Sequence, residues 1–248
     1  MEWLLELVLK RFGESELKGS VLITGFRGFG MVGYLASKHL ALALRAEKAG
    51  VILLRDTPAF IAVEEDGVGY PFEVYYSPKH RATILLNRAV PQGRALAEYG
   101  RGVVEWVERV GFNYVILIGG LNREFKPGSD TYGYRWLKNS EYRGPHLQAP
   151  ELEEGLGVVG PLAYLYMLLD VKRIPTVMVL SYTFPEAIDY DAVLVAVRVV
   201  ARDLLGADLA FEELEALAKK QRDEIEKIIR MLEVETARAS EEARGMYM

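Results

Sequence analysis

A strand–turn–helix pattern in residues 21–44 constrains the fold more than any other stretch of this sequence. Val21–Thr24 is a run of apolar and β-branched residues, which predicts a short buried strand. An apolar-periodic helix is predicted from about Met31 to Leu44. The turn between them is dense in glycine, which tolerates left-handed backbone angles and lets backbones approach closely: Gly25, Gly28, Gly30 and Gly33. This is the opening half of a βαβ unit, so the rest of the chain is expected to form an α/β layer against it.

The glycine turn can be understood in two ways. Residues Gly28–Gly33 match G-x-G-x-x-G, the dinucleotide fingerprint, in which a helix N-terminus attracts phosphate. Asp56 closes the next apolar run, Val51–Leu54, roughly where a ribose-binding acid would lie. Alternatively, the glycines only allow close packing of the strand and the helix. A β-hairpin is predicted after Asp56, where a Rossmann domain would have a helix, and this counts against dinucleotide binding.

Later segments alternate between strands and helices. The hairpin covers residues 60–76, and the acids of its turn, Glu64-Glu65-Asp66, are interpreted as solvated rather than as an acid/base pair. The other predicted strands are Ala82–Asn87, Tyr114–Ile118 (ending at Gly119-Gly120) and Pro175–Ser181, and the helices are Gln92–Val110, Val158–Leu169 and Tyr190–Leu205. Because the buried strands lack polar alternation, a largely parallel sheet with helices on both faces is expected.

The segment Asn122–Gly155 departs from this alternation. It is polar and interrupted by prolines, yet it contains four large aromatic residues: Tyr132, Tyr134, Trp136 and Tyr142. It follows a strand end, where α/β proteins usually place their sites. We interpret it as a surface excursion whose aromatic side chains pack locally or at a subunit contact, and no function is assigned to it.

The C-terminal part is predicted to be a separate element. In Ala210–Val234 the stripe Leu214, Leu217, Gln221, Ile225, Ile228 and Leu232 recurs at three- and four-residue spacing, which is typical of a coiled-coil seam. Glu235–Gly245 is polar and is expected to fray. The sequence therefore predicts three parts: a core domain at 1–209, a coiled-coil-like helix at 210–234 and a flexible tail at 235–248.

Composition excludes several classes of protein. A net charge of −5 gives no reason to expect nucleic acid, and the absence of cysteine excludes disulfides and thiolate metal sites. The scattered residues His39, His80 and His146 suggest no metal site, and neither a Walker A loop nor a G-x-S-x-G elbow is present. The N-terminus carries acids within its apolar stretch, unlike a signal peptide, and no uncharged run is long enough to span a membrane. A cytoplasmic protein is expected.

The sharpest signal is the final tripeptide, Met246-Tyr247-Met248. Two large apolar residues, a phenol and a free carboxylate stand together at the end of a charged tail. Capture of a C-terminal carboxylate in a partner's pocket is a known mode of peptide recognition. Alternatively, the tail packs on its own domain, or it ends in these residues by accident.

Five segments together resemble the proteasome assembly chaperone family. They are ITGFRGFGMVG, the hairpin after Asp56, ILIGG, GVVGPLAYLYMLL and PTVMVLSYTFP, within residues 18–232. The resemblance implies a three-layer α/β/α sandwich with a mostly parallel central sheet, similar to the nucleoside-phosphorylase type. It also implies a homo-oligomer of the kind found in archaea and some bacteria, with no enzymatic activity and no cofactor. The lack of cysteine and the many Glu, Lys and Arg residues fit a thermophilic source.

The same resemblance gives the final tripeptide a role. It matches the hydrophobic–tyrosine–any residue motif of proteasome activators and some archaeal homologues. The resemblance implies that Met246 fills an apolar slot, that Tyr247 seats against the pocket between two α-subunits of the proteasome core particle, and that the carboxylate of Met248 pairs with a pocket lysine. The chain is thus expected to be a proteasome assembly chaperone or an ATP-independent activator. The alternative is a nucleotide- or nucleoside-binding enzyme that uses the Gly28–Gly33 turn.

Overall fold

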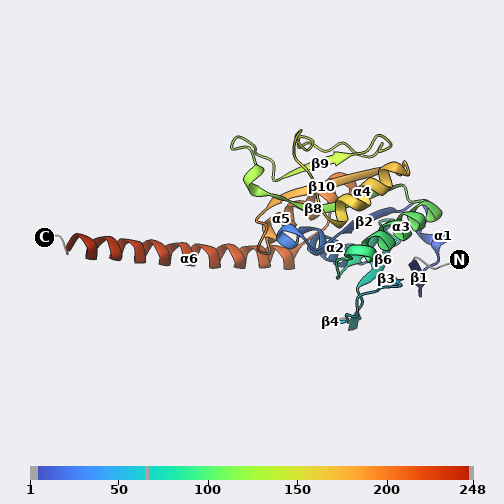
Figure 1. Cartoon of the computed structure of the whole chain (residues 1–248), viewed down its shortest axis with the longest axis horizontal. Coiled ribbons are helices and arrows are strands. Elements are labelled where there is room, and N and C mark those ends of the chain that lie inside the picture. Colours follow the sequence, from blue (N-terminus) through green and yellow to red (C-terminus); the bar gives the residue numbers. More distant parts are fainter. Residues whose placement is uncertain (1–4, 65–66, 246–248) are drawn as a thin grey trace. The chain divides into compact units, whose positions relative to one another are not determined.

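The computed structural model describes residues 5–64 and 67–245 of the 248-residue chain, and Figure 1 traces its elements. The chain divides into two compact units, Met1–Phe211 and Glu212–Met248. The first unit holds the sheet and its covering helices, and the second is a helix with the final residues.

Within the described residues of the first unit, eight strands form one sheet in the order β1-β3-β6-β7-β2-β8-β10-β9. Their bounds are β1 Leu5–Leu9, β2 Val21–Gly25, β3 Glu47–Leu54, β6 Phe72–Ser77, β7 Ala82–Asn87, β8 Tyr114–Asn122, β9 Tyr134–Lys138 and β10 Thr176–Thr183. The β7-β2-β8-β10 pairs are parallel, whereas the pairs at both sides are antiparallel. The expected mostly parallel sheet is therefore confirmed for the middle of the sheet.

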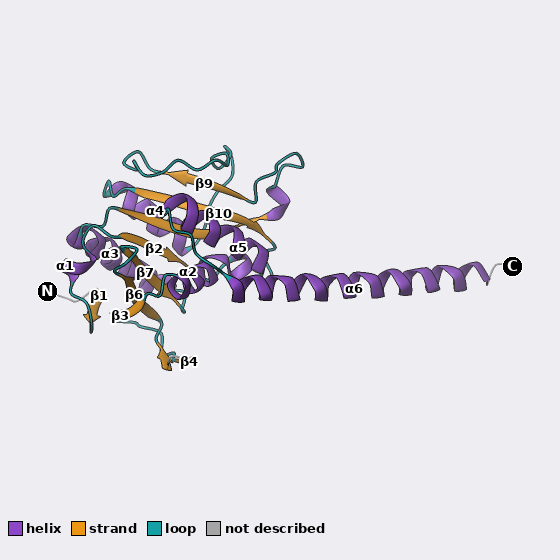
Figure 2. Ribbon diagram, turned by 180° about the vertical axis from the view of Figure 1, so that it is seen from behind, coloured by secondary structure: helices purple, strands orange, loops and turns teal. Residues whose placement is uncertain are grey.

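Helices cover the sheet, as expected for the α/β class. On one face α2 (Val32–Ala43) packs against α5 (Tyr190–Arg198), and on the other α3 (Gly93–Val110) packs against α4 (Pro161–Val171). Figures 1 and 2, seen from opposite sides, show these two layers. Shorter elements complete the first unit: α1 Glu14–Leu17, the 3-10 turns η1 Phe29–Met31 and η2 Arg123–Phe125, and the π-helical continuation of α5, η3 Val199–Leu204.

The sequence of α3 explains its place in the core. Its apolar residues recur at helical spacing and are buried on the sheet-facing side: Val103, Trp106, Val107 and Val110. Gly111 ends the helix in a left-handed conformation (φ 76°), and its N–H donates to the carbonyl oxygen of Val107. The predicted boundaries of this helix are confirmed to within one residue.

Two predictions around β8 need correction. The strand does not stop at Gly119-Gly120, because it continues through both glycines to Asn122 in register with β10. The excursion after it contains the edge strand β9, which was not predicted from the sequence. The aromatic residues of this excursion pack locally: Trp136 is fully buried, and its Nε1 donates to the carbonyl oxygen of Ala149 at 2.7 Å.

The second unit is one long helix, α6 (Glu212–Gly245). It includes residues 235–245, for which fraying was expected, and their Ala, Glu and Arg content favours helix. Its exposed apolar residues are Ile225, Ile228, Ile229, Met231 and Leu232, which are between 48% and 59% exposed. Met246, Tyr247 and Met248 lie outside the described residues. Among the helices of the described chain, none combines the length and the apolar character needed to cross a bilayer.

The hairpin after Asp56 is smaller than expected. Strands β4 (Ala62–Glu64) and β5 (Gly67–Gly69) pair only with each other, and the next segment forms β6 in the main sheet. We call residues 60–64 and 67–69 the arm. In Figure 1 its strand β4 projects from the body below β3.

Ionic contacts anchor the arm, so the prediction of a solvated Glu64 was wrong. Arg88 Nε donates to Glu64 Oε1 at 3.0 Å, and Lys38 Nζ lies 3.4 Å from Glu64 Oε2. Arg88 also pairs with the fully buried Glu73, which accepts a second ion pair from Lys48. The hydrogen bond from Arg88 holds the pKa of Glu64 below its usual value, against the opposing effect of burial.

This depressed pKa makes the anchoring of the arm sensitive to acid. The Glu64–Arg88 contact is fully present above the ordinary glutamate pKa of about 4.3 and is lost as the pH falls through the lower folded-state value. Methyl NMR signals of Val63 and Val68 should report a transition in that acidic range. Glu64→Gln should abolish this transition, whereas replacing the exposed Glu154 by Gln should leave it unchanged. The same transition in Glu64→Gln would contradict the assignment.

Candidate functional site

The glycine turn connects the central strand to the helix above it. β2 ends at Gly25, and the N–H of Tyr34 in α2 donates back to the carbonyl oxygen of Phe26 at 3.1 Å. Between them the N–H of Met31 donates to the carbonyl oxygen of Gly28 at 2.9 Å. Gly30 and Met31 are both left-handed, with φ of 62° and 58°. A left-handed methionine is uncommon and shows how tightly the turn is constrained.

Close packing accounts for most of these glycines. A Cβ on Gly33 would lie 2.5 Å from the carbonyl oxygen of Ile118, and a Cβ on Gly25 would lie 2.5 Å from that of Gly33. A Cβ on Gly30 would overlap Thr183. Gly28 is different, because a Cβ there would meet no atom within 4 Å. The geometry favours a packing role over a nucleotide-binding role for Gly30 and Gly33, two of the three fingerprint glycines.

A buried chain of hydrogen bonds fixes the end of β2. Tyr99 Oη of α3 donates to Asn87 Oδ1 at 2.6 Å, and Asn87 Nδ2 donates to Thr24 Oγ1 at 2.9 Å and to the carbonyl oxygen of Gly25 at 3.0 Å. All four residues are buried, and burial raises the pKa of the Tyr99 phenol. These polar groups form hydrogen bonds with one another, so their role is to fix the turn and not to bind a substrate.

Asp56 is not brought to the glycine turn. In a Rossmann domain the strand that carries the ribose-binding acid lies beside the first strand. Here β6 and β7 separate β3 from β2, so Asp56 follows a strand about three spacings, or roughly 14 Å, away. The two features that suggested a dinucleotide site are therefore not assembled into one.

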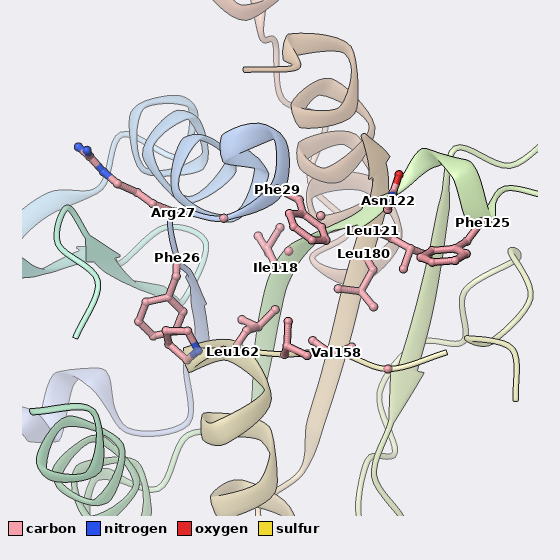
Figure 3. Close-up of a pocket in the computed structure, with 17 residues that line it drawn as sticks. Phe26, Arg27, Phe29, Ile118, Leu121, Asn122, Phe125, Val158, Leu162 and Leu180 are labelled. Atoms are coloured by element: carbon pink, nitrogen blue, oxygen red, sulfur yellow. The ribbon is translucent and has the colours of Figure 1, made fainter. Parts of the chain in front are cut away.

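A pocket of about 270 Å³ opens at the carboxyl ends of β2 and β8, beside the start of α4. Figure 3 shows side chains of Ile118, Val158, Leu162, Leu180 and Phe29 gathered around it. Arg27 extends away from this space and Asn122 lies at its margin. The volume is slightly below the usual range for small-molecule sites, and the lining is mostly apolar. Such a site suits an apolar or aromatic side chain better than a phosphate.

This pocket was not predicted from the sequence, because its wall comes from distant segments. Phe125 lies near the start of the long excursion, Val158 follows its end, and Phe29 belongs to the glycine turn. The signal that was available is the position of the excursion, which begins at a strand end and returns through a glycine-rich stretch, residues 155–160. Such placement indicates a site but not its chemistry.

The histidines remain scattered, as the sequence indicated. His80 Nδ1 lies 3.1 Å from Ser77 Oγ, and the ring of His146 packs edge-on against Trp136. His39 is buried in α2. In the part of the chain that the structure describes, no group of three or more His, Asp or Glu residues is arranged to hold a metal ion.

Paired substitutions test the packing role of the glycines. Gly33→Ala should lower the free energy of unfolding by about 1–3 kcal/mol, because the added methyl group would displace β8 or the turn. This loss should exceed the gain of up to about 1 kcal/mol that alanine brings to a helix. Gly28→Ala should change stability by less than about 0.5 kcal/mol. Urea unfolding of both variants gives the comparison, and equal effects would refute the packing role.

The fold and this site together define a mixed α/β protein with a large central sheet and an apolar pocket at the carboxyl edge of that sheet. The chain belongs to the PAC2 family, whose model matches residues 22–229. This confirms the resemblance to the proteasome assembly chaperone family that the sequence motifs indicated.

Known proteins similar to this chain include one curated relative and several solved structures. An uncharacterised protein of Methanocaldococcus jannaschii is 26% identical over 92% of this chain and 90% of its own length. Pyrococcus furiosus PbaA, an archaeal homolog of proteasome-assembly chaperone, has a TM-score of 0.75 at 19% identity, over 98% of this chain and 99% of its own. Pyrococcus furiosus PbaB, an archaeal proteasome activator, has a TM-score of 0.70 at 19% identity, over 90% and 98%. These structures establish the shared fold.

Proposed function

We propose that this protein is a non-enzymatic, homo-oligomeric partner of the proteasome core particle that acts in the cytoplasm of a thermophilic archaeon. It would serve as an assembly chaperone or as an ATP-independent activator. The observation that carries the proposal is membership of the PAC2 family, together with a fold shared over nearly the whole chain with PbaA and PbaB. Of these two proteins, the first is a homolog of proteasome-assembly chaperone and the second is a proteasome activator.

The proposed contact is the C-terminal tripeptide. Met246 would fill an apolar slot, Tyr247 would seat between two α-subunits, and the carboxylate of Met248 would pair with a lysine of the pocket. Burial of a phenol and an apolar side chain with a paired carboxylate is a chemically consistent recognition element. One such tail binds weakly, because ordering a few residues costs entropy.

Helix α6 supports the multivalent form of this proposal. Its 34 residues correspond to about 51 Å of helix, and its exposed isoleucine, leucine and methionine side chains suit contact with α6 of other copies. Copies joined through this stripe would present several tails at once. After the first tail has bound, the others bind at a high effective concentration, so the assembly gains affinity without any new type of contact.

The nucleotide-binding alternative has lost the two features that motivated it. Close packing accounts for Gly30 and Gly33, and Asp56 stands apart from the turn. A thermal-shift screen with 1 mM NAD, ATP or nucleosides should show no stabilisation. A ligand with a Kd of about 10 μM would add about 2.7 kcal/mol at that concentration, which such a screen detects readily.

Pull-down of purified α-rings by the full chain tests the docking proposal. Deletion of residues 246–248, Tyr247→Ala, and one residue appended after Met248 should each weaken recovery at least about tenfold, because each removes or displaces a group of the proposed contact. Tyr132→Ala, which alters a partly exposed tyrosine elsewhere, is the matched control and should bind as the unmodified chain does. Equal recovery by the Tyr247→Ala and Tyr132→Ala variants would refute docking through the tail.

A further inference from the structure

The arm presents an apolar face to solvent. Val63 lies on β4 directly opposite Val68 on β5, so the two side chains share one face of the arm, and Ile61 immediately precedes β4. The side chains of Ile61, Val63 and Val68 are 65%, 89% and 46% exposed. A two-stranded ribbon of this size normally needs to pack its apolar face to be stable.

The opposite face of the arm is polar and is fastened to the body. Glu64 alternates with Val63 and points to Arg88 and Lys38. Gly69 packs so closely on Arg88 that a Cβ there would lie 2.6 Å from Nε, and Lys48 Nζ donates to the carbonyl oxygen of Val68 at 3.0 Å. The usual arrangement is thus reversed, since ions hold the inner face and the aliphatic residues face outward. An apolar face that is fixed in this way marks a contact surface.

The arm and the apolar pocket lie at the same end of the sheet, where the parallel strands have their carboxyl ends. β7, β2, β8 and β10 are parallel, and β3 points the same way because it is antiparallel to β6, which is antiparallel to β7. The arm follows the carboxyl end of β3, and the pocket lies at the carboxyl ends of β2 and β8. A two-fold axis that passes between the arm and the pocket at this end of the sheet would bring the arm of each copy to the pocket of the other.

The pocket and the arm are complementary in size and character. The pocket wall is mostly apolar, and its outer residues Phe29, Phe125 and Val159 are 43%, 53% and 78% exposed. A volume of 270 Å³ accommodates one or two aliphatic side chains.

Charge agrees with this pairing. Near the pocket the chain carries three cations, Arg27, Arg123 and Lys126, and one acid, Glu124. The two residues between β4 and β5 in the sequence, Glu65 and Asp66, are both acidic. The two regions therefore carry opposite net charges.

We propose that the arm of one copy inserts Val63, with Ile61 and Val68 beside it, into the pocket of a second copy of this chain. The contact joins the bodies of two subunits and goes beyond the proposed function, because neither α6 nor the C-terminal tripeptide takes part in it. Its failure would leave tail docking untouched, and a failure of tail docking would leave this contact intact.

The absence of native cysteines allows a direct test. Full-length Val63→Cys and Val159→Cys variants are mixed and treated with a short bismaleimide, and the heterodimer is followed over time. Cysteine is a small hydrophobe, so Val63→Cys keeps the character of the arm. The heterodimer should form at least about tenfold faster than in a mixture of Val63→Cys with Val171→Cys, because a docked pair holds its thiols at millimolar effective concentration. Val171 is the matched control, since it is 78% exposed at the far end of α4.

A second variant tests insertion into the pocket itself. Gly28 lines the pocket in extended backbone, and a Cβ there would meet no atom within 4 Å, so Gly28→Leu is designed to add an apolar side chain at the cavity. Added to Val159→Cys, Gly28→Leu should reduce cross-linking to the Val171→Cys level, whereas Gly28→Ala should not. Equal rates for the Val159→Cys and Val171→Cys mixtures would overturn the proposal. Rates that are insensitive to Gly28→Leu would overturn it as well.

Discussion

The close approach of β2, α2 and β8 is the contact on which the rest of the structure depends. Gly25 and Gly33 let the helix start almost on the backbone of Ile118, and the hydrogen bonds from Asn87 hold the strand end beneath it. Because α2 begins so close to β8, η1 packs directly on Gly120. A methyl group on Gly120 would clash with the carbonyl oxygen of Phe29. The apolar pocket is the space left beside this packed turn, so its position follows from the same glycines.

This arrangement explains how a sheet edge that holds catalytic groups in many α/β proteins can serve recognition instead. Its interior groups are mostly aliphatic and aromatic, nearby polar side chains such as Tyr99 and Asn87 are paired with one another, and Arg27 extends away from the space. Apolar side chains also face solvent on the arm and along α6. Three surfaces suited to protein contact thus occur on a chain that shares its fold with PbaA and PbaB.

The sequence was informative where one local pattern decides the outcome. The strand–turn–helix at residues 21–44, the amphipathic α3 and the long C-terminal helix all follow from periodicity and glycine placement. Predictions from the sequence failed where contacts with residues far away in the chain determine the structure. Glu64 looked solvated because Arg88, which pairs with it, lies 24 positions away, and β8 continued through two glycines because β10 supplies its hydrogen bonds. The pocket is lined by four separate segments, so no single stretch of sequence could reveal it.

The length of α6 has a geometric consequence for whatever follows it. Each residue of an α-helix advances the chain by about 1.5 Å and turns it by about 100°. Inserting one residue near the middle of α6 would hardly change its length, yet it would swing the far end to a different side of the helix axis. Removing seven residues would shorten the helix by about 10 Å and nearly restore the direction. The distance of the chain end from the start of α6 and its direction around the helix axis are therefore separate quantities, and evolution can adjust each independently.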